Sequence, residues 1–201
     1  MNNGRKISRD NENPIDNTLI DISYKLGKVF KIFNFTPNMI TTISLIITLI
    51  GINNIYNGNY KIGAILYFIG YLFDCMDGNY ARTYNMTSKF GSIYDPVSDH
   101  IKSIFLIICI YLLKINSKTK ILFGIIFVIF SIISYIYIGC QEKIINQDNK
   151  NKSVLEFLTF LCPNIENIKY LRYFGSGTTN FITSLFIFNI KFINKFINKF
   201  I

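Results

Sequence analysis

Apolar residues in this chain gather in long blocks instead of alternating with polar ones. Four blocks have about the length of the roughly 20 apolar residues that a helix needs to cross a bilayer, and they cover residues 36–55, 61–82, 94–113 and 121–139. Thr36 suits the N-cap of the first block, and Pro37 suits its first helical turn. The pattern therefore predicts an all-α integral membrane protein.

The last third of the chain is less regular. Residues 141–153 are polar and predict a loop, residues 154–162 are apolar but too short to span, and residues 178–192 form a further apolar segment. The tail KFINKFINKFI repeats every four residues, so its lysines share one helical stripe. This tail either extends the last span by lysine snorkelling or lies flat on the membrane. We expect about five to six transmembrane helices.

The segment before the first block has two parts. Residues 1–17 are polar and predict a disordered N-terminus. Residues 18–35 place apolar side chains at helical spacing with lysines between them, which is typical of an amphipathic helix on the membrane surface. We therefore divide the chain into a disordered segment 1–17, a juxtamembrane helix 18–35 and a transmembrane domain 36–201.

Composition and charge agree with a membrane location. Only 16% of the residues are charged, against about a quarter in soluble domains. The net charge of +9 comes from Lys and Arg that lie almost wholly outside the apolar blocks, where lipid headgroups attract them. No nucleic-acid recognition motif accompanies this charge, so a nucleic-acid partner is not expected.

Charge also predicts an orientation. Lys and Arg are frequent before the first block, and the short loop after it contains only Lys61. The N-terminus and the loop that follows the second block should therefore face the cytoplasm. The lysines between residues 114 and 120 argue against this orientation.

The four cysteines, Cys75, Cys109, Cys140 and Cys162, lie in or beside apolar blocks and lack paired spacing. This arrangement indicates small buried side chains instead of a disulfide framework or a zinc site.

The aspartates are the most informative polar residues. Asp74 and Asp77 end the second block three residues apart, and Asp95 and Asp99 begin the third block four residues apart. Each pair shares one helix face, and an antiparallel return of the chain brings all four carboxylates together.

Four carboxylates at one point repel one another and require a compensating cation. Oxygen ligands favour Mg²⁺ or Mn²⁺, and a pair of such ions can clamp both sides of a phosphoryl displacement. Small residues nearby leave room for a ligand, and Arg82 offers a forked set of donors to phosphate. The residues thus predict a site with one or two divalent ions that acts on phosphate.

The pattern D-x2-D-G-x2-A-R-x8-G-x3-D-x3-D resembles the signature of the CDP-alcohol phosphotransferases. The chain matches it without gap or substitution at Asp74, Asp77, Gly78, Ala81, Arg82, Gly91, Asp95 and Asp99. The resemblance implies that Asp74, Asp77 and Asp95 bind the metal pair that holds the donor's diphosphate. It also implies that Asp99 contacts a metal and acts as general base on the acceptor hydroxyl.

The resemblance implies further roles around the nucleotide. Gly78, Ala81 and Gly91 would border the cytidine nucleotide, and Arg82 would organise the site. Asn38 belongs to a Pro-Asn element that approaches the nucleotide in this family. The alcohol would attack the phosphorus next to the lipid, CMP would leave, and the protein would be a homodimer.

Several substrates and roles stay open at this point. The leading hypothesis is a phospholipid synthase with CDP-diacylglycerol as donor and a small polar alcohol as acceptor. The run DPVSD favours a glycerol phosphate-like acceptor, while inositol and serine remain possible. CDP-choline or CDP-ethanolamine transfer to diacylglycerol is disfavoured, because its enzymes usually carry Gln and His where this chain has Tyr80 and Pro96. A catalytically inactive membrane scaffold is the third alternative.

Three other residues are candidates for minor roles. Lys169 and Arg172 could bind a phosphate on the acceptor, and His100 could tune or replace the base.

Overall fold

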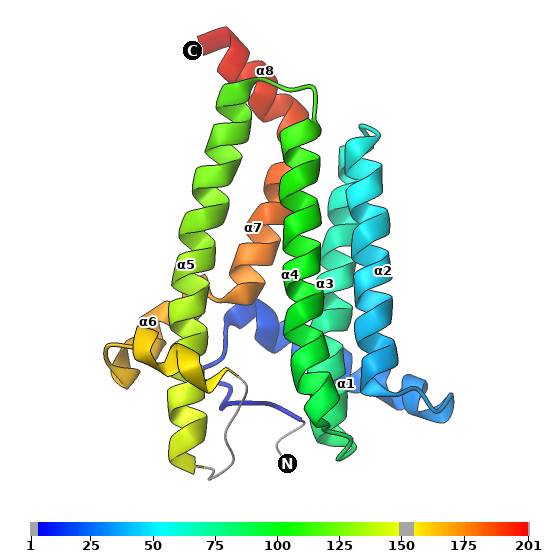
Figure 1. Cartoon of the computed structure of the whole chain (residues 1–201), viewed down its shortest axis with the longest axis vertical. Coiled ribbons are helices and arrows are strands. Elements are labelled where there is room, and N and C mark those ends of the chain that lie inside the picture. Colours follow the sequence, from blue (N-terminus) through cyan, green and yellow to red (C-terminus); the bar gives the residue numbers. More distant parts are fainter. Residues whose placement is uncertain (1–3, 149–154, 201) are drawn as a thin grey trace.

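The computed structural model describes residues 4–148 and 155–200, and this part of the chain is helical and without strands. Five helices run roughly along the long axis of the molecule (Figure 1). They are α2 (Pro37–Tyr56), α3 (Tyr60–Thr83), α4 (Lys89–Leu112), α5 (Ser117–Asp148) and α7 (Ser176–Phe188). The prediction of an all-α fold is confirmed.

Shorter elements close the two ends of this bundle. Helix α1 (Pro14–Ile32) lies across the lower end and α8 (Ile190–Phe200) across the upper end (Figure 1). Beside α5 lie η1 (Glu156–Leu161), η2 (Ile165–Asn167), α6 (Ile168–Leu171) and η3 (Arg172–Phe174). The apolar segment predicted at residues 178–192 is interrupted at Asn189, so the lysine-rich tail forms a separate helix.

Local sequence signals set the helix starts. The Thr36 hydroxyl accepts a hydrogen bond from the Met39 N–H at 3.3 Å, and Pro37 is the first helical residue of α2, as predicted. The Ser88 hydroxyl caps α4 in the same way by accepting from the Gly91 N–H at 3.0 Å. Both caps satisfy backbone donors that have no partner within the helix.

Helices α2 and α3 pack closely through glycines. A Cβ atom on Gly63 would lie 2.5 Å from Ile55 Cγ1, and one on Gly70 would lie 2.1 Å from Thr48 Oγ1. The backbones can therefore approach more closely than larger residues would allow. Gly70 precedes Asp74 by about one turn of α3. The contact at Gly70 therefore fixes where Asp74 lies along the length of α2.

Within the described residues, two helices, α2 and the Ser117–Asn146 part of α5, are long and apolar enough to cross a membrane. The other predicted spans form helices but do not meet that criterion. Many large apolar side chains on α4 and α5 face outward, including Ile104, Phe105, Ile108, Val128, Ile129 and Ile132. A surface of this kind is typical of contact with lipid or with another protein. Together these features indicate a membrane protein.

The N-terminal segment differs from the disorder expected for residues 1–17. Ile7 is 5% exposed and Asn13 is fully buried. The Asn13 side chain accepts from the N–H groups of Ile15 and Asp16, and α1 begins immediately afterwards at Pro14. The segment is ordered because polar groups from distant parts of the chain form hydrogen bonds with it. Residues 1–3 lie outside the described residues.

Helix α5 also continues further than expected. A loop was predicted for residues 141–153, but the helix extends through Asp148, and residues 149–153 lie outside the described part. Gln141 and Glu142 are buried, and they contact Glu12 and Lys6 of the N-terminal segment. These distant partners allow polar residues to continue a buried helix.

The cysteine prediction is wrong for one pair. Cys140 and Cys162 form a disulfide that joins α5 to the end of η1, whereas Cys75 and Cys109 are free. Their spacing in the sequence carried no signal because η1 returns alongside α5 only in three dimensions.

Candidate active site

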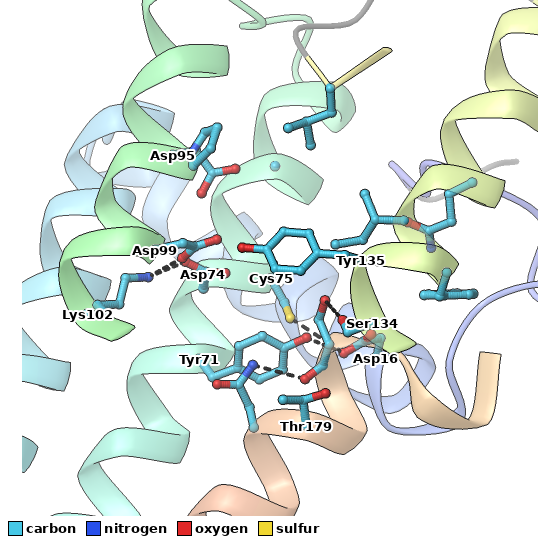
Figure 2. Close-up of a pocket in the computed structure, with 18 of the residues that line it drawn as sticks. Asp16, Tyr71, Asp74, Cys75, Asp95, Asp99, Lys102, Ser134, Tyr135 and Thr179 are labelled. Atoms are coloured by element: carbon cyan, nitrogen blue, oxygen red, sulfur yellow. Dashed lines mark hydrogen bonds and ion pairs between the residues drawn. The ribbon is translucent and has the colours of Figure 1, made fainter. Parts of the chain in front are cut away.

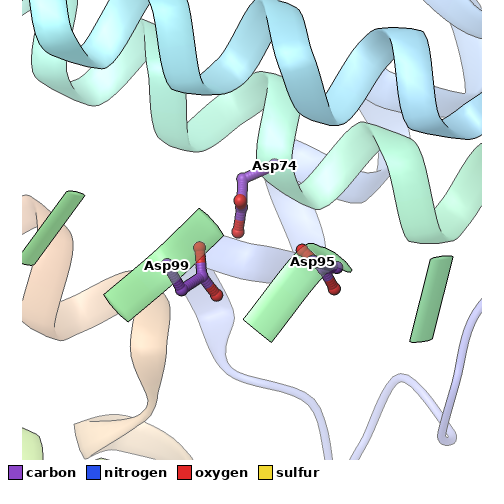
Figure 3. A group of neighbouring side chains, drawn as sticks. All are labelled: Asp74, Asp95 and Asp99. Atoms are coloured by element: carbon purple, nitrogen blue, oxygen red, sulfur yellow. The ribbon is translucent and has the colours of Figure 1, made fainter. Parts of the chain in front are cut away.

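Three of the four predicted aspartates meet where α3 and α4 run side by side. Asp74 comes from α3, and Asp95 and Asp99 come from successive turns of α4 (Figures 2 and 3). One carboxylate oxygen from each of the three lies within 4.8 Å of the other two. The sequence spacing predicted a meeting of all four carboxylates, and the structure shows it for these three.

Asp77 stands apart from this group of three carboxylates. It is 4% exposed, and its Oδ2 accepts a hydrogen bond of 2.6 Å from the Thr41 hydroxyl on α2. Its side chain is thereby held toward α2 and away from the group of three.

Lys102 supplies a cation that the sequence analysis missed. Its Nζ pairs with Asp74 Oδ1, lies 2.8 Å from Asp99 Oδ1, and donates to the Ser44 hydroxyl at 3.1 Å (Figure 2). The residue is 7% exposed. The sequence did contain a signal for this residue, since Lys102 lies inside an apolar block one turn after Asp99. A charged residue in such a block usually pairs with a residue of opposite charge.

The cluster of Asp74, Asp95 and Asp99 is suited to bind a hard divalent cation. All its donor atoms are oxygens, the ligand type that Mg²⁺ and Mn²⁺ prefer. Asp95 Oδ1 is buried without a hydrogen-bond partner, and such an atom is costly unless something binds it. A metal ion would satisfy it.

A cavity of about 370 Å³ opens on one side of the aspartates. Asp74, Asp95 and Asp99 form one wall of it (Figure 2). Neutral polar side chains of α5 and α7 line the opposite wall, namely Ser131, Ser134, Tyr135, Ser176, Thr179 and Asn180. This cavity can hold a small polar molecule beside Asp99, half of whose side chain is accessible.

A second cavity of about 210 Å³ opens on the other side and contains all the residues predicted to border the nucleotide, Asn38, Gly78, Ala81, Arg82 and Gly91. A Cβ atom on Gly91 would lie 3.0 Å from Asn38 Oδ1, and one on Gly78 would lie 3.2 Å from an Arg82 guanidinium nitrogen. The glycines thus leave this space open, as the sequence predicted. Asp77 and Asp95 line both cavities.

Asp16 is a buried carboxyl group at the site that the sequence analysis missed. It lines the larger cavity, accepts from the Tyr71 hydroxyl at 2.6 Å, and accepts from the Gly177 N–H at 3.2 Å (Figure 2). Burial raises the pKa of Asp16 from 3.8 to about 7, although the Tyr71 hydrogen bond acts in the opposite direction. Its place in a segment predicted to be disordered concealed it.

The remaining candidates differ in position. His100 lines the larger cavity, and its Nδ1 lies 2.6 Å from the Pro96 carbonyl oxygen. Neither Lys169 nor Arg172 lines either cavity. Lys169 is exposed, and the Arg172 guanidinium binds the Asp10 carbonyl oxygen. These two residues therefore do not face the aspartates.

Known proteins resemble this chain over the region of the site. A curated relative from Pyrococcus horikoshii, an archaetidylinositol phosphate synthase, is 32% identical over 77 residues, which are 38% of this chain and 41% of the relative. CDP-diacylglycerol–glycerol-3-phosphate 3-phosphatidyltransferases from Rickettsia typhi and Rickettsia prowazekii are each 38% identical over 68 residues. Those matches cover 31% of this chain and 37% and 36% of the respective relatives. The matched regions thus span about two fifths of the relatives' length.

No solved structure matches the chain. The family model for CDP-alcohol phosphatidyltransferases matches residues 34–163. This range includes the four aspartates and every residue predicted to border the nucleotide. The chain therefore belongs to the CDP-alcohol phosphatidyltransferase family.

Proposed function

We propose that this protein is a membrane-bound phospholipid synthase. It transfers a phosphatidyl group from CDP-diacylglycerol to a small polar alcohol and releases CMP. The observation that carries this proposal is the cluster of three aspartates between two cavities. The smaller cavity is lined by all the residues that are predicted to border the nucleotide.

The proposed metal site consists of Asp74, Asp77, Asp95 and Asp99, with Mg²⁺ or Mn²⁺ as a two-ion cofactor. Bound ions would neutralise the donor's diphosphate, which makes its phosphorus easier to attack. Asp77 would join the other three ligands by turning its carboxylate away from Thr41. The unpartnered Asp95 oxygen supports the assignment.

We assign Asp99 as the general base. It lines only the larger cavity, where the acceptor would lie, whereas Asp95 lines both cavities. The acceptor oxygen forms a bond to the phosphorus attached to the lipid, and the bond from that phosphorus to CMP breaks. The hydroxyl proton passes to Asp99, and holding the two reactants side by side supplies much of the rate.

The smaller cavity is the proposed nucleotide site. Gly78, Ala81 and Gly91 leave room for the cytidine portion, and Asn38 and Arg82 contribute polar contacts. The Arg82 guanidinium is held in place because its Nε donates to the Gly4 carbonyl oxygen at 2.7 Å.

A glycerol phosphate-like or inositol-like alcohol is the proposed acceptor. The names of the curated relatives refer to inositol phosphate and to glycerol 3-phosphate products or substrates, and the polar wall of α5 and α7 suits a hydroxyl-rich molecule.

Helices α2, α3, α4, α5 and α7 would form a multi-pass bundle within residues 36–201. Helix α1 would lie on the surface, the aspartates would face the cytoplasm, and two copies would form a homodimer.

The test is CMP release by the purified protein in lipid nanodiscs. The protein receives CDP-diacylglycerol, Mg²⁺ or Mn²⁺, and one alcohol at a time. Release with one alcohol, lost with a chelator, supports the synthase and names its acceptor. Absence of release with every alcohol, and with CDP-choline plus diacylglycerol, would favour the inactive scaffold.

Substitution of Asp99 by Asn tests the proposed base. We expect CMP release to fall by at least about 100-fold, since a positioned base contributes roughly 10²–10⁴ in rate. CDP affinity in Mg²⁺ should fall much less than CMP release, because three of the four proposed carboxylate ligands remain and Asp99 does not line the nucleotide cavity. Unchanged CMP release would remove Asp99 from the mechanism.

A further inference from the structure

The N-terminal segment, residues 4–13, crosses the end of the bundle where the aspartates lie (Figure 1). The Gly4 carbonyl oxygen accepts from Arg82, and the Asn11 carbonyl oxygen accepts from the Tyr137 hydroxyl at 3.0 Å. Gly4 adopts a φ of +66°, and a Cβ atom there would lie 2.2 Å from Thr83 Oγ1. The segment is thus held against α3 at one end and against α5 at the other.

Besides Glu12, which lines the larger cavity, Lys6 is the residue of this segment that faces the site. It lines both the larger and the smaller cavity. A third of its side chain is exposed, and its Nζ lies 2.5 Å from Oε1 of Glu142 on α5. Glu142 is fully buried, and its second oxygen has no hydrogen-bond partner. A buried carboxylate therefore fixes the Lys6 ammonium group at the place where the two cavities meet.

The charges at this junction favour an anionic ligand beside Lys6. Asp77 and Asp95 line both cavities, so a phosphate there needs nearby cations. Arg82 also lines both cavities, but its Nε is occupied by Gly4. Lys102 is engaged with Asp74 and Asp99. Lys6 has three N–H donors, and its ion pair with Glu142 uses only one of them.

We propose that Lys6 binds a substrate phosphate at the junction of the two cavities, and this assignment rests on the proposed function. The phosphate belongs either to the donor's diphosphate or to a phosphorylated acceptor, since both present the same anionic oxygens. Lys6 lies before residues 34–163, so the family match does not assign it.

The test compares variants of Lys6 in nanodiscs. Lys6→Met alone would leave Glu142 buried without its partner, so the main variant is Lys6→Met combined with Glu142→Gln. Lys6→Arg keeps the charge. Lys25→Met removes an exposed lysine of α1 that lines neither cavity, and it serves as the matched control.

Two arms identify the source of the phosphate. In the first arm, CDP affinity is measured by calorimetry with Mg²⁺, without turnover. If the donor's diphosphate binds Lys6, the double variant should lose about tenfold in CDP affinity, because a hydrogen bond to a charged group contributes roughly that much. In the second arm, KM is compared for glycerol 3-phosphate and for glycerol. If the acceptor's phosphate binds Lys6, KM should rise only for glycerol 3-phosphate.

Lys25→Met should retain the original values in both arms, and Lys6→Arg, which keeps the charge, should lose less than the double variant. A double variant that unfolds at the same temperature as the original protein, with CDP affinity and both KM values unchanged, would overturn the proposal. If the original protein releases no CMP with any alcohol but CDP affinity still falls in the double variant, the proposed reaction fails and the Lys6 assignment stands.

Discussion

At the aspartate end of α3 and α4, Lys102 lies between Asp74 and Asp99 and offsets part of their mutual repulsion. A metal ion bound to these carboxylates would compete with the lysine for the same oxygens. The metal-free and metal-bound states of the site should therefore depend on Lys102 in opposite ways.

Substitution of Lys102 by Met should lower the unfolding temperature of the protein without metal. Breaking a buried ion pair leaves an uncompensated charge and costs about 3–5 kcal/mol. Mg²⁺ should then raise the unfolding temperature more in the variant than in the original protein. Thermal unfolding in detergent, with and without Mg²⁺, measures both effects.

Lys120→Met is the control for this experiment, since the Lys120 ammonium group contacts the exposed Tyr111, through its carbonyl oxygen and its ring, and no carboxylate among the described ion pairs. Equal unfolding temperatures for Lys102→Met and Lys120→Met without metal would contradict the role of Lys102.

Asp16 predicts a pH dependence of stability. Its pKa is raised from 3.8 to about 7 by burial, so between these values the folded protein keeps a proton that the unfolded chain has released. Stability should therefore fall as pH rises from about 4 to 7 and level off above 7, by at most about 4 kcal/mol at 1.36 kcal/mol per pKa unit. Asp16→Asn should make this decline smaller.

Thermal unfolding between pH 4 and pH 8 checks the prediction, with Asp10→Asn as an exposed control. An identical decline in the original protein and in Asp16→Asn would show that other groups cause it.

At the scale of helices, the contact between α2 and α3 depends on the absence of side chains at a few positions. Gly63 faces both Ile55 and the carbonyl oxygen of Gly51, which its Cβ would approach to 2.7 Å. The backbone cannot yield as a flexible side chain can. The packing of α3, and with it the position of Asp74, therefore depends on glycine.

Gly63→Ala should destabilise the protein by about 1–3 kcal/mol, the usual cost of overpacking. Gly124→Ala on α5 is the matched control, because nothing lies within 4 Å of its Cβ position. Alanine is the better helix former, so that change should be neutral or stabilising by up to about 1 kcal/mol. Equilibrium unfolding in detergent distinguishes the two, and equal effects would show that the glycine contact is unimportant.

At the scale of the whole molecule, the outward apolar surface of α4 and α5 supports a bundle that crosses the membrane several times. Asn59 and Lys89 lie near opposite ends of α3, and Lys118 lies near the start of α5. If α3 and α4 both span, Asn59 and Lys118 lie on one side of the membrane and Lys89 lies on the other.

Single cysteines at these three positions test the arrangement, in a variant whose four native cysteines are alanine. A membrane-impermeant maleimide should label Lys89→Cys from the cytoplasmic side, and Asn59→Cys and Lys118→Cys from the opposite side. Labelling of all three from one side would rule out a multi-pass bundle of this form.

The sequence by itself determined the helical architecture and the centre of the site. Helix starts such as Thr36-Pro37 depend on a few neighbouring residues, and apolar blocks depend only on local composition. The spacing of Asp74, Asp95 and Asp99 places them on the faces of two consecutive helices, so a single antiparallel return brings them together. The residues that line the smaller cavity were predicted from the family resemblance, and all but Asn38 lie in the same stretch as the aspartates.

Only the tertiary structure revealed the partners that come from distant segments. Lys6 and Glu142 are 136 residues apart, and Asp16 and Gly177 are 161 residues apart. These contacts order the N-terminal segment, extend α5 through a polar stretch, and bring Cys140 to Cys162. Local propensity and charge pattern describe each segment as if it faced solvent or lipid alone. Whether a polar residue is instead buried depends on whether a distant partner can satisfy its hydrogen bonds, and packing alone decides that.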